Sequence, residues 1–188
     1  MDHLRSDLQG AFPITGQLIS SVAADRWQAP STCDDWSLRQ LGEHLVGGVA
    51  LTALVLAGDE ATARPDVSEL SDEDLAPAFT EAGEKVIAVL ADPEALQRIV
   101  RVGIGPVPGA VAAQLCLVET LVHGWDVAHI SGQKVVFEEE TVARALAFSE
   151  AMLGQIPQGR SPFAQATEPA QDASTLDHLV ALLGRQAA

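Results

Sequence analysis

Hydrophobic residues recur along this chain at the three- and four-residue spacing of amphipathic helices, and segments rich in glycine, proline and polar residues separate the periodic stretches. The pattern predicts a first helix from Asp2 to about Ala24, which Pro13 should bend or split because proline cannot donate a backbone hydrogen bond. The apolar face of this helix consists of Leu4, Leu8, Ile14, Leu18 and Val22.

Further helices follow in the same pattern. They are expected from Ser37 to about Ala57, from Pro77 to about Leu90, from Pro108 to about Ile130, from Glu138 to Gly154 and over residues 174–185. The helices at Ser37 and Ser174 each begin with a capping box, in which two side chains satisfy each other's free backbone N–H groups. Residues 97–104 alternate like a short strand or extended connector, and residues 155–173 are expected to form a surface loop.

Helices joined by short connections predict an all-α fold, a bundle with short extra helices. The chain of 188 residues is long enough for one domain with a full hydrophobic core, so we expect a single domain over residues 1–188. Hydrophobic residues make up 47% of the chain, which excludes an intrinsically disordered protein.

The charge of the chain excludes two classes of partner. Lys and Arg total 11 against 26 Asp and Glu, which gives a formal net charge of −15, and the basic residues form no cluster. Because negative charge repels phosphate backbones and anionic membrane surfaces, we expect neither nucleic acid nor membrane as a partner.

The cysteines and the N-terminus indicate a soluble cytoplasmic protein. Cys33 and Cys116 are far apart and have no CxxC partner, so neither a disulfide framework nor a thiolate zinc cluster is expected. The N-terminus lacks the apolar core of a signal peptide, and the longest uncharged helical run, Leu45–Ala57, is too short to cross a bilayer. The sequence leaves open a homodimer formed through a helix face.

The helix expected after Pro108 carries the most informative polar residues. Glu119, His123 and Asp126 fall within an arc of about 60° on its apolar face, where Leu would otherwise be expected. Burying an unpaired carboxylate costs several kcal/mol, and no Lys or Arg lies between Arg101 and Lys134 to neutralise it. A divalent cation would provide the missing charge; the alternative is a core pair hydrogen-bonded to backbone or water.

A third ligand must come from another helix. His44 lies at the edge of the core-facing side of the helix expected from Ser37, and facing helices of a bundle can bring such groups together. His44, Glu119 and His123 would form a His₂Glu site, which leaves a fourth position for water or substrate. Asp126 would orient a ligand histidine through its free ring nitrogen or move a proton, or else make a structural hydrogen bond.

Three segments of the chain resemble the DinB/YfiT-like superfamily. TCDDWSLRQLGEH at residues 32–44 is similar to the motif of its second helix, and ETLVHGWD at residues 119–126 is similar to its second ligand motif. The third segment is LDHLVALLGR at residues 176–185. The last is similar to the end of a short-chain branch found in mycothiol-using bacteria.

The resemblance implies a four-helix bundle of the DinB-like, up-down-down-up kind. Within the superfamily, the chain is similar to the N-terminal, metal-binding domain of mycothiol-dependent maleylpyruvate isomerase. The ligand pattern of that domain, one histidine of the second helix and a later Glu-x-x-x-His, corresponds to His44, Glu119 and His123 of this sequence.

The first functional hypothesis is a metal-dependent enzyme that uses a low-molecular-weight, mycothiol-like thiol in a transfer or isomerisation on a small electrophile. A metal-dependent hydrolase and a non-catalytic, stress-linked metal-binding module are the alternatives. A His₂Glu set suits Zn²⁺, although imidazole and carboxylate ligands also accept Ni, Fe or Mn. Cys33, Cys116, Trp36 and Trp125 are interpreted as structural residues, and His3, His129 and His178 as surface histidines.

Overall fold

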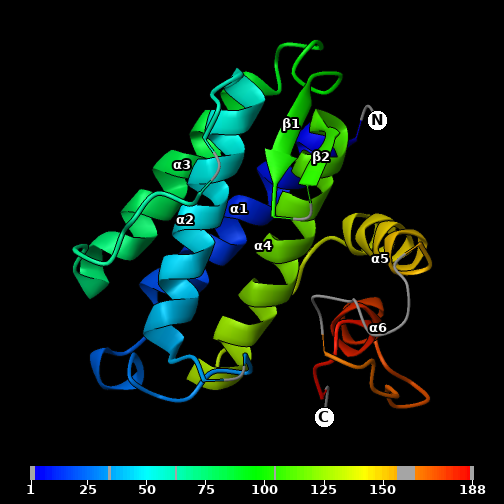
Figure 1. The fold of residues 1–188 in the computed structure, drawn as a ribbon. Coiled ribbons are helices and arrows are strands. Elements are labelled where there is room, and N and C mark those ends of the chain that lie inside the picture. The colour runs from blue at the N-terminus through cyan, green and yellow to red at the C-terminus, as the bar shows by residue number, and fades with distance from the viewer. Residues whose placement is uncertain (1–2, 34, 62, 104, 156–163, 187–188) are drawn as a thin grey trace. The chain divides into compact units, whose positions relative to one another are not determined.

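The structure is a computed structural model that describes residues 3–33, 35–61, 63–103, 105–155 and 164–186. Its α-helices are α1 (Leu4–Ser20), α2 (Leu38–Ala57), α3 (Leu75–Val89), α4 (Gly109–Ser131), α5 (Glu139–Leu153) and α6 (Thr175–Leu182), and its strands are β1 (Ile99–Val102) and β2 (Gly105–Pro108). Short 3₁₀ turns occupy Ala24–Arg26 and Asp72–Asp74. The predicted all-α class is confirmed (Figure 1).

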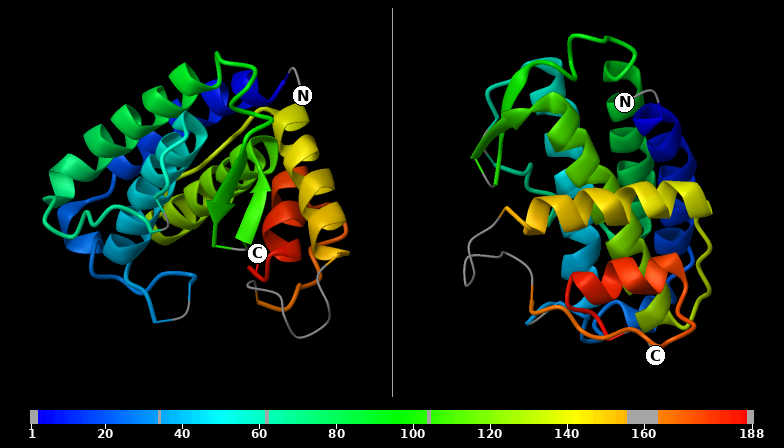
Figure 2. Two further views of the ribbon diagram at one scale, coloured as in Figure 1. Left: turned by 45° about the horizontal axis from the view of Figure 1, so that its top comes forward. Right: turned by 90° about the vertical axis from the view of Figure 1, so that its right-hand side faces the viewer.

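The chain divides into two compact units, Met1–Val135 and Val136–Ala188. In the first unit, α1 packs against α3 and α4, and α2 packs against the same two helices, so the four form a bundle (Figures 1 and 2). The predicted helical bundle is therefore confirmed. For the function, the important pairing is α2 with α4, because the polar residues singled out in the sequence lie on these two helices.

Large apolar side chains from all four helices fill the interior of the bundle. Leu8, Leu41, Phe79 and Leu121 are fully buried. The rings of Phe12 and Phe79 meet edge to face with their centroids 5.8 Å apart, an arrangement that aromatic pairs favour. Burial of this surface is the main source of stability and holds α2 and α4 in fixed positions.

The ends of α2 and α4 follow the sequence closely. Ser37 and Gln40 form the predicted capping box at the start of α2. Gly58 ends α2 with φ of 95° and Gly132 ends α4 with φ of 74°, a left-handed conformation that glycine adopts without steric cost. Local signals thus define the start of α2 and the C-terminal ends of both helices that carry the candidate site.

Two prolines disturb the helices less than the sequence pattern indicates. Pro13 does not split α1, which is continuous through it, and the side chain lies on the exposed side, where water can reach the freed carbonyl. α3 begins at Leu75 instead of Pro77, so Pro77 lies in its first turn. Proline is tolerated there because the backbone N–H groups of the first turn have no partner within the helix in any case.

Residues 97–104 contain the predicted strand as β1, but it pairs with a second strand that the sequence analysis missed. β1 and β2 form an antiparallel hairpin in which Ile99 lies opposite Pro108 and Val102 lies opposite Gly105. The prolines and glycine of β2 indicated a break in regular structure. They are tolerated because each strand of a two-stranded hairpin is an edge strand, where a missing N–H can face solvent.

α2 is also long and apolar enough to cross a membrane, by length and composition alone. The uncharged run Leu45–Ala57 alone is too short to cross a bilayer, whereas the whole helix is long enough. In the bundle, α2 packs against α3 and α4, as buried core helices that pass this criterion commonly do.

In the second unit, α5 packs against α6 around Val142, Ala145, Leu179 and Val180. The predicted capping box of Ser174 and Asp177 begins α6. Of the predicted loop over 155–173, residues 156–163 lie outside the described residues, and residues 164–173 contain neither helix nor strand. The single domain over 1–188 stays a prediction.

Candidate metal site

The packing of α2 on α4 brings His44, Glu119 and His123 together, although His44 and Glu119 lie 75 residues apart in the sequence. The Nε2 atom of His44 lies 2.8 Å from Oε2 of Glu119, and Nε2 of His123 lies 3.2 Å from the same oxygen. The imidazole rings of the two histidines are 5.0 Å apart between centroids and nearly perpendicular. Three groups that can bind a metal thus converge on one point.

Helical geometry explains the arrangement on α4. Glu119 and His123 are four residues apart, so both side chains project from the same side of the helix. His123 is buried, whereas 35% of the Glu119 side chain and 13% of the His44 side chain are exposed. The site is therefore closed behind His123 and open in front of Glu119.

The histidines and the carboxylate change one another's protonation. Burial alone would raise the pKa of Glu119, but hydrogen bonds from His123 and His44 hold it well below its usual range. Burial likewise opposes the charge of His123, but Asp126, Cys33 and Glu119 raise the pKa of this imidazole well above its ordinary value. The pKa of His44 is lowered, chiefly by burial.

Asp126 lies behind His123, on the side of the ring away from Glu119. Its Oδ2 is 2.8 Å from Nδ1 of His123, and the carboxylate is fully buried. A carboxylate at this place favours a proton on Nδ1 and leaves Nε2 directed toward Glu119. Cys33 also hydrogen-bonds to His123, and its Sγ lies within 4.8 Å of a ligand atom of Asp126.

Trp36 and Arg64 complete the surroundings of His44. The indole ring of Trp36 lies 4.8 Å from the His44 ring between centroids, in a tilted orientation. The positive charge of Arg64 contributes to the lowered pKa of His44, after burial as the main cause. Trp36 and Cys33, which were predicted to be structural residues, thus lie beside the candidate ligands. Arg64 was not predicted; the sequence signal for it is the pair Gly47 and Gly48, which admits a close neighbour.

The other histidines and the second cysteine lie apart from this chemistry. His3, His129 and His178 are exposed, and the His129 ring stacks on Trp125 at 4.7 Å between centroids. Burial raises the pKa of the Cys116 thiol to about 12, so it stays protonated at neutral pH. A protonated thiol is a poor metal ligand and a poor nucleophile.

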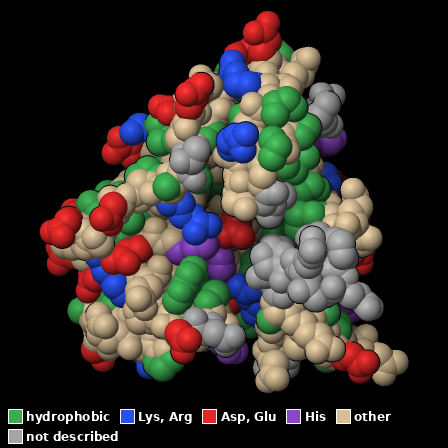
Figure 3. Space-filling view, viewed as in Figure 1, with side chains coloured by type: hydrophobic (Ala, Val, Ile, Leu, Met, Phe, Trp, Pro, Cys, Tyr) green, Lys and Arg blue, Asp and Glu red, His purple; other side chains and the backbone are tan. Residues whose placement is uncertain are grey.

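The donor set fits a divalent cation. Two imidazoles and one carboxylate are the ligands of many open zinc sites. Ligand atoms around a tetrahedral zinc ion lie about 3.3 Å apart. The separations of 2.8 and 3.2 Å seen here require only small adjustments to reach that spacing. Figure 3 shows histidine side chains at the surface with acidic and basic side chains directly beside them.

Comparisons with known proteins agree with the fold. The model of the mycothiol maleylpyruvate isomerase N-terminal domain matches residues 14–128. Uncharacterised proteins of two Mycobacterium tuberculosis strains, Rv0738 of H37Rv and MT0763 of CDC 1551, are each 32% identical over 98% of this chain and 96% of their own length.

Among solved structures, a mycothiol-dependent maleylpyruvate isomerase superposes with a TM-score of 0.61 and 15% identity, over 78% of this chain and 67% of that one. A DinB-like protein of Bacillus subtilis, YjoA, superposes with a TM-score of 0.57 and 20% identity, over 71% of this chain and 95% of that one. These structures share the fold, and the family model covers more than half of the chain. The chain therefore belongs to the mycothiol maleylpyruvate isomerase N-terminal domain family.

Proposed function

We propose that this protein is a metal-dependent enzyme in which His44, Glu119 and His123 hold one divalent cation and a low-molecular-weight thiol reacts with a small electrophile. The observation that carries the proposal is the convergence of the two Nε2 atoms on Oε2 of Glu119, at 2.8 and 3.2 Å. Three donors with an open side give the arrangement expected of a catalytic site, whereas a structural zinc site has four protein ligands.

A bound divalent cation would act as a Lewis acid and lower the pKa of a thiol or water at the open position. The chain's own residues have separate tasks in this proposal. Glu119 supplies a negative charge that offsets one of the two positive charges of the cation, and His44 and His123 supply neutral nitrogen donors. Asp126 holds the His123 ring in the tautomer that presents Nε2, through the 2.8 Å hydrogen bond to Nδ1. Trp36 borders the site with an apolar ring next to His44.

The choice of a thiol as the reactant rests on the family. The matched family model and a solved structure of the same fold carry mycothiol in their names. The reaction class is addition of the thiol to an electrophilic double bond: the S–C bond forms, the π bond breaks, and the thiol proton ends on the substrate. The sulfur then either stays, which gives transfer, or leaves as the thiol after bond rotation, which restores the double bond and gives isomerisation. Zinc is the metal we expect for two imidazoles and one carboxylate.

Elemental analysis of the purified protein tests the metal ligands. We expect about one zinc equivalent per chain in the wild type after zinc loading and dialysis, and a loss of that equivalent in His123→Ala. His129→Ala is the matched control, because this histidine lies on the same helix but is exposed and stacks on Trp125. Equal zinc content in wild type and His123→Ala would contradict the proposed ligand set.

Turnover assays test the thiol. The zinc-loaded protein is given a panel of electrophiles with and without a low-molecular-weight thiol, beside a known mycothiol-dependent relative as positive control. Activity only with thiol supports the proposal. Activity without thiol would instead indicate the metal-dependent hydrolase, and no turnover while the relative is active would indicate the non-catalytic metal-binding module.

A further inference from the structure

Arg64 lies beside the candidate site because two glycines of α2 leave room for it. The segment containing Arg64 and Pro65 contacts α2 at Gly47 and Gly48, about one helical turn beyond His44. A Cβ atom on Gly47 would lie 3.2 Å from the carbonyl oxygen of Pro65 and 3.3 Å from Cβ of Arg64. A Cβ atom on Gly48 would lie 3.6 Å from Nε of Arg64. The Arg64 side chain therefore rests directly on the helix next to the site.

Arg64 is exposed, and its guanidinium group has no protein partner among the residues that the structure describes. Within the described part of the chain, it makes neither a hydrogen bond nor an ion pair. Other arginines are engaged: Arg39 pairs with Glu43 and Asp72, and Arg98 donates to the carbonyl oxygen of Leu56. In a protein with 26 acidic residues and a net charge of −15, this leaves an available cation next to the site.

The chemistry of arginine defines what it would bind there. Its planar guanidinium presents several N–H donors in a fork that matches the oxygen atoms of a carboxylate or phosphate. An anion held by Arg64 would lie close to His44, because Nε of Arg64 lies against Gly48, which is one helical turn beyond His44 on the same side of α2.

We propose that Arg64 binds an oxyanion group of the small molecule that reacts at His44, Glu119 and His123, and thereby selects anionic electrophiles over neutral ones. This inference rests on the proposed function, since it specifies the substrate of the same site. Gly47 contributes to this arrangement, because a residue without a side chain lets the 64–65 segment pack closely against α2 beside the site.

Calorimetric titration of the zinc-loaded, full-length protein tests the assignment. The probes are succinate, its uncharged dimethyl ester and inorganic phosphate. We expect wild type to bind succinate more tightly than the ester, and Arg64→Gln to weaken succinate binding about tenfold at unchanged zinc content, since a charge-assisted bidentate contact is lost. Phosphate bound more tightly than succinate, and weakened by the same substitution, would support the oxyanion site and identify phosphate as its preferred group.

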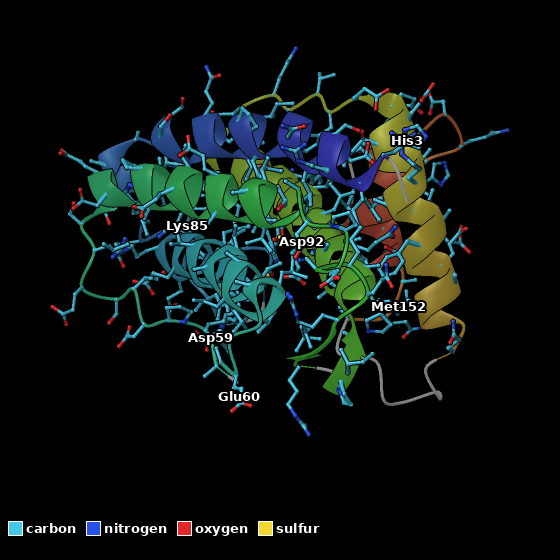
Figure 4. All side chains as sticks on the ribbon, turned by 90° about the horizontal axis from the view of Figure 1, so that it is seen from above. His3, Asp59, Glu60, Lys85, Asp92 and Met152 are labelled. Atoms are coloured by element: carbon cyan, nitrogen blue, oxygen red, sulfur yellow. The ribbon has the colours of Figure 1, made fainter. Side chains whose placement is uncertain are left out.

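Arg101→Gln is the matched control for the loss of one positive charge. Arg101 is exposed and has no side-chain hydrogen bond or ion pair within the described residues, but it lines a separate cavity with Asp59 and Glu60. Figure 4 shows Asp59 and Glu60 after the C-terminal end of α2, the end opposite His44 in the sequence of that helix. Succinate binding weakened equally by Arg101→Gln and Arg64→Gln would overturn the assignment, because only net charge would then matter.

A second pair of variants tests the geometry without changing the charge. Gly47→Ala should weaken succinate binding, because the added methyl group displaces the 64–65 segment, whereas Gly48→Ala makes only an ordinary contact and should bind succinate as wild type does. Wild-type affinity for succinate in both Arg64→Gln and Gly47→Ala would overturn the proposal. Failure of the proposed function would show separately, as missing zinc or missing turnover. In that case, titrations of the zinc-free protein would still compare the succinate affinity of Arg64→Gln with that of its controls.

Discussion

At the scale of single residues, His123 contacts both carboxylates of the candidate site, those of Glu119 and Asp126. One ring nitrogen faces Glu119 at 3.2 Å, and the other faces Asp126 at 2.8 Å. The ring therefore lies between two carboxylates, one at the opening and one buried. Substitution of Asp126 should consequently alter the site although this residue does not face its opening.

Asp126→Asn should weaken zinc binding by about 10- to 100-fold, the usual effect of removing a group that orients a ligand histidine. It should also lower the pKa of His123 in the metal-free protein, since the Asp126 carboxylate is among the groups that raise it. Competition with a zinc chelator measures the first effect, and NMR titration of the imidazole measures the second. Asp25→Asn, at an exposed position, is the control. An unchanged His123 titration would show that Asp126 has no such influence.

The stability of the metal-free protein should depend on pH through His123. Its pKa in the folded state is raised above the ordinary 6.5, so the protonated imidazole stabilises the fold. This contribution is fully present below the unfolded-state pKa and is lost as the pH rises through the folded-state pKa. We expect the free energy of unfolding to fall on the alkaline side of pH 6.5 in wild type, and this fall to be absent in His123→Gln.

Urea denaturation at a series of pH values measures this dependence, with His129→Gln as a control that should keep the wild-type profile. On the acid side, His44 acts in the opposite sense: because its pKa is lowered, its contribution diminishes as the pH falls below 6.5. A wild-type stability that rises continuously into the alkaline range would contradict the raised pKa of His123.

At the scale of secondary-structure elements, the boundaries of α2 and α4 depend on local chemistry. Ser37 caps α2, and Gly58 and Gly132 end the two helices in left-handed conformations. The start of α4 also depends on a tertiary contact. Gly109 is buried there, and a Cβ atom at this position would lie 2.0 Å from the carbonyl oxygen of Ala95.

Gly109→Ala should therefore destabilise the protein by about 1–3 kcal/mol or more, because the backbone at Ala95 or the start of α4 must move. Gly10→Ala is a matched control in α1, where an added Cβ meets nothing within 4 Å. That substitution should stabilise by about 0.5–1 kcal/mol, since alanine favours a helix over glycine. Chemical denaturation of the two variants measures both effects, and equal stabilities would contradict the close contact at Gly109.

Elements defined by local signals could be predicted from the sequence, and elements defined by distant contacts could not. The two capping boxes and the ends of α2 and α4 near Ala57 and Ile130 were predicted correctly, because a few adjacent residues determine them. β2 was missed because its prolines are acceptable only when paired with β1. For the site, helical spacing grouped Glu119 with His123, and the superfamily resemblance supported the choice of His44. Cys33 and Arg64 reach the site from loops whose course the sequence pattern does not define.

At the scale of the whole molecule, an ion held by α2 and α4 would link parts of the chain that are distant in sequence. The bundle already buries a full set of apolar side chains, so the fold does not depend on the ion for its core. A ligand that binds the folded state alone still stabilises it by mass action.

Zinc should accordingly raise the thermal unfolding midpoint of wild type. At a free zinc concentration 100 times the dissociation constant, the stabilisation should be about 2.7 kcal/mol. Scanning calorimetry with and without zinc measures the shift, and His44→Ala should show much less of it. An identical shift in His44→Ala would mean that zinc stabilises the protein somewhere else.

The spacing of the donors also has a consequence in time. His44 emerges from the ribosome 75 residues before Glu119, and the three donors can meet only after α4 has been made and has docked on α2. During refolding, zinc should therefore bind with the affinity of the folded protein only after these two helices have associated. A zinc-sensitive dye in a stopped-flow experiment would then measure the rate at which α2 and α4 associate during refolding.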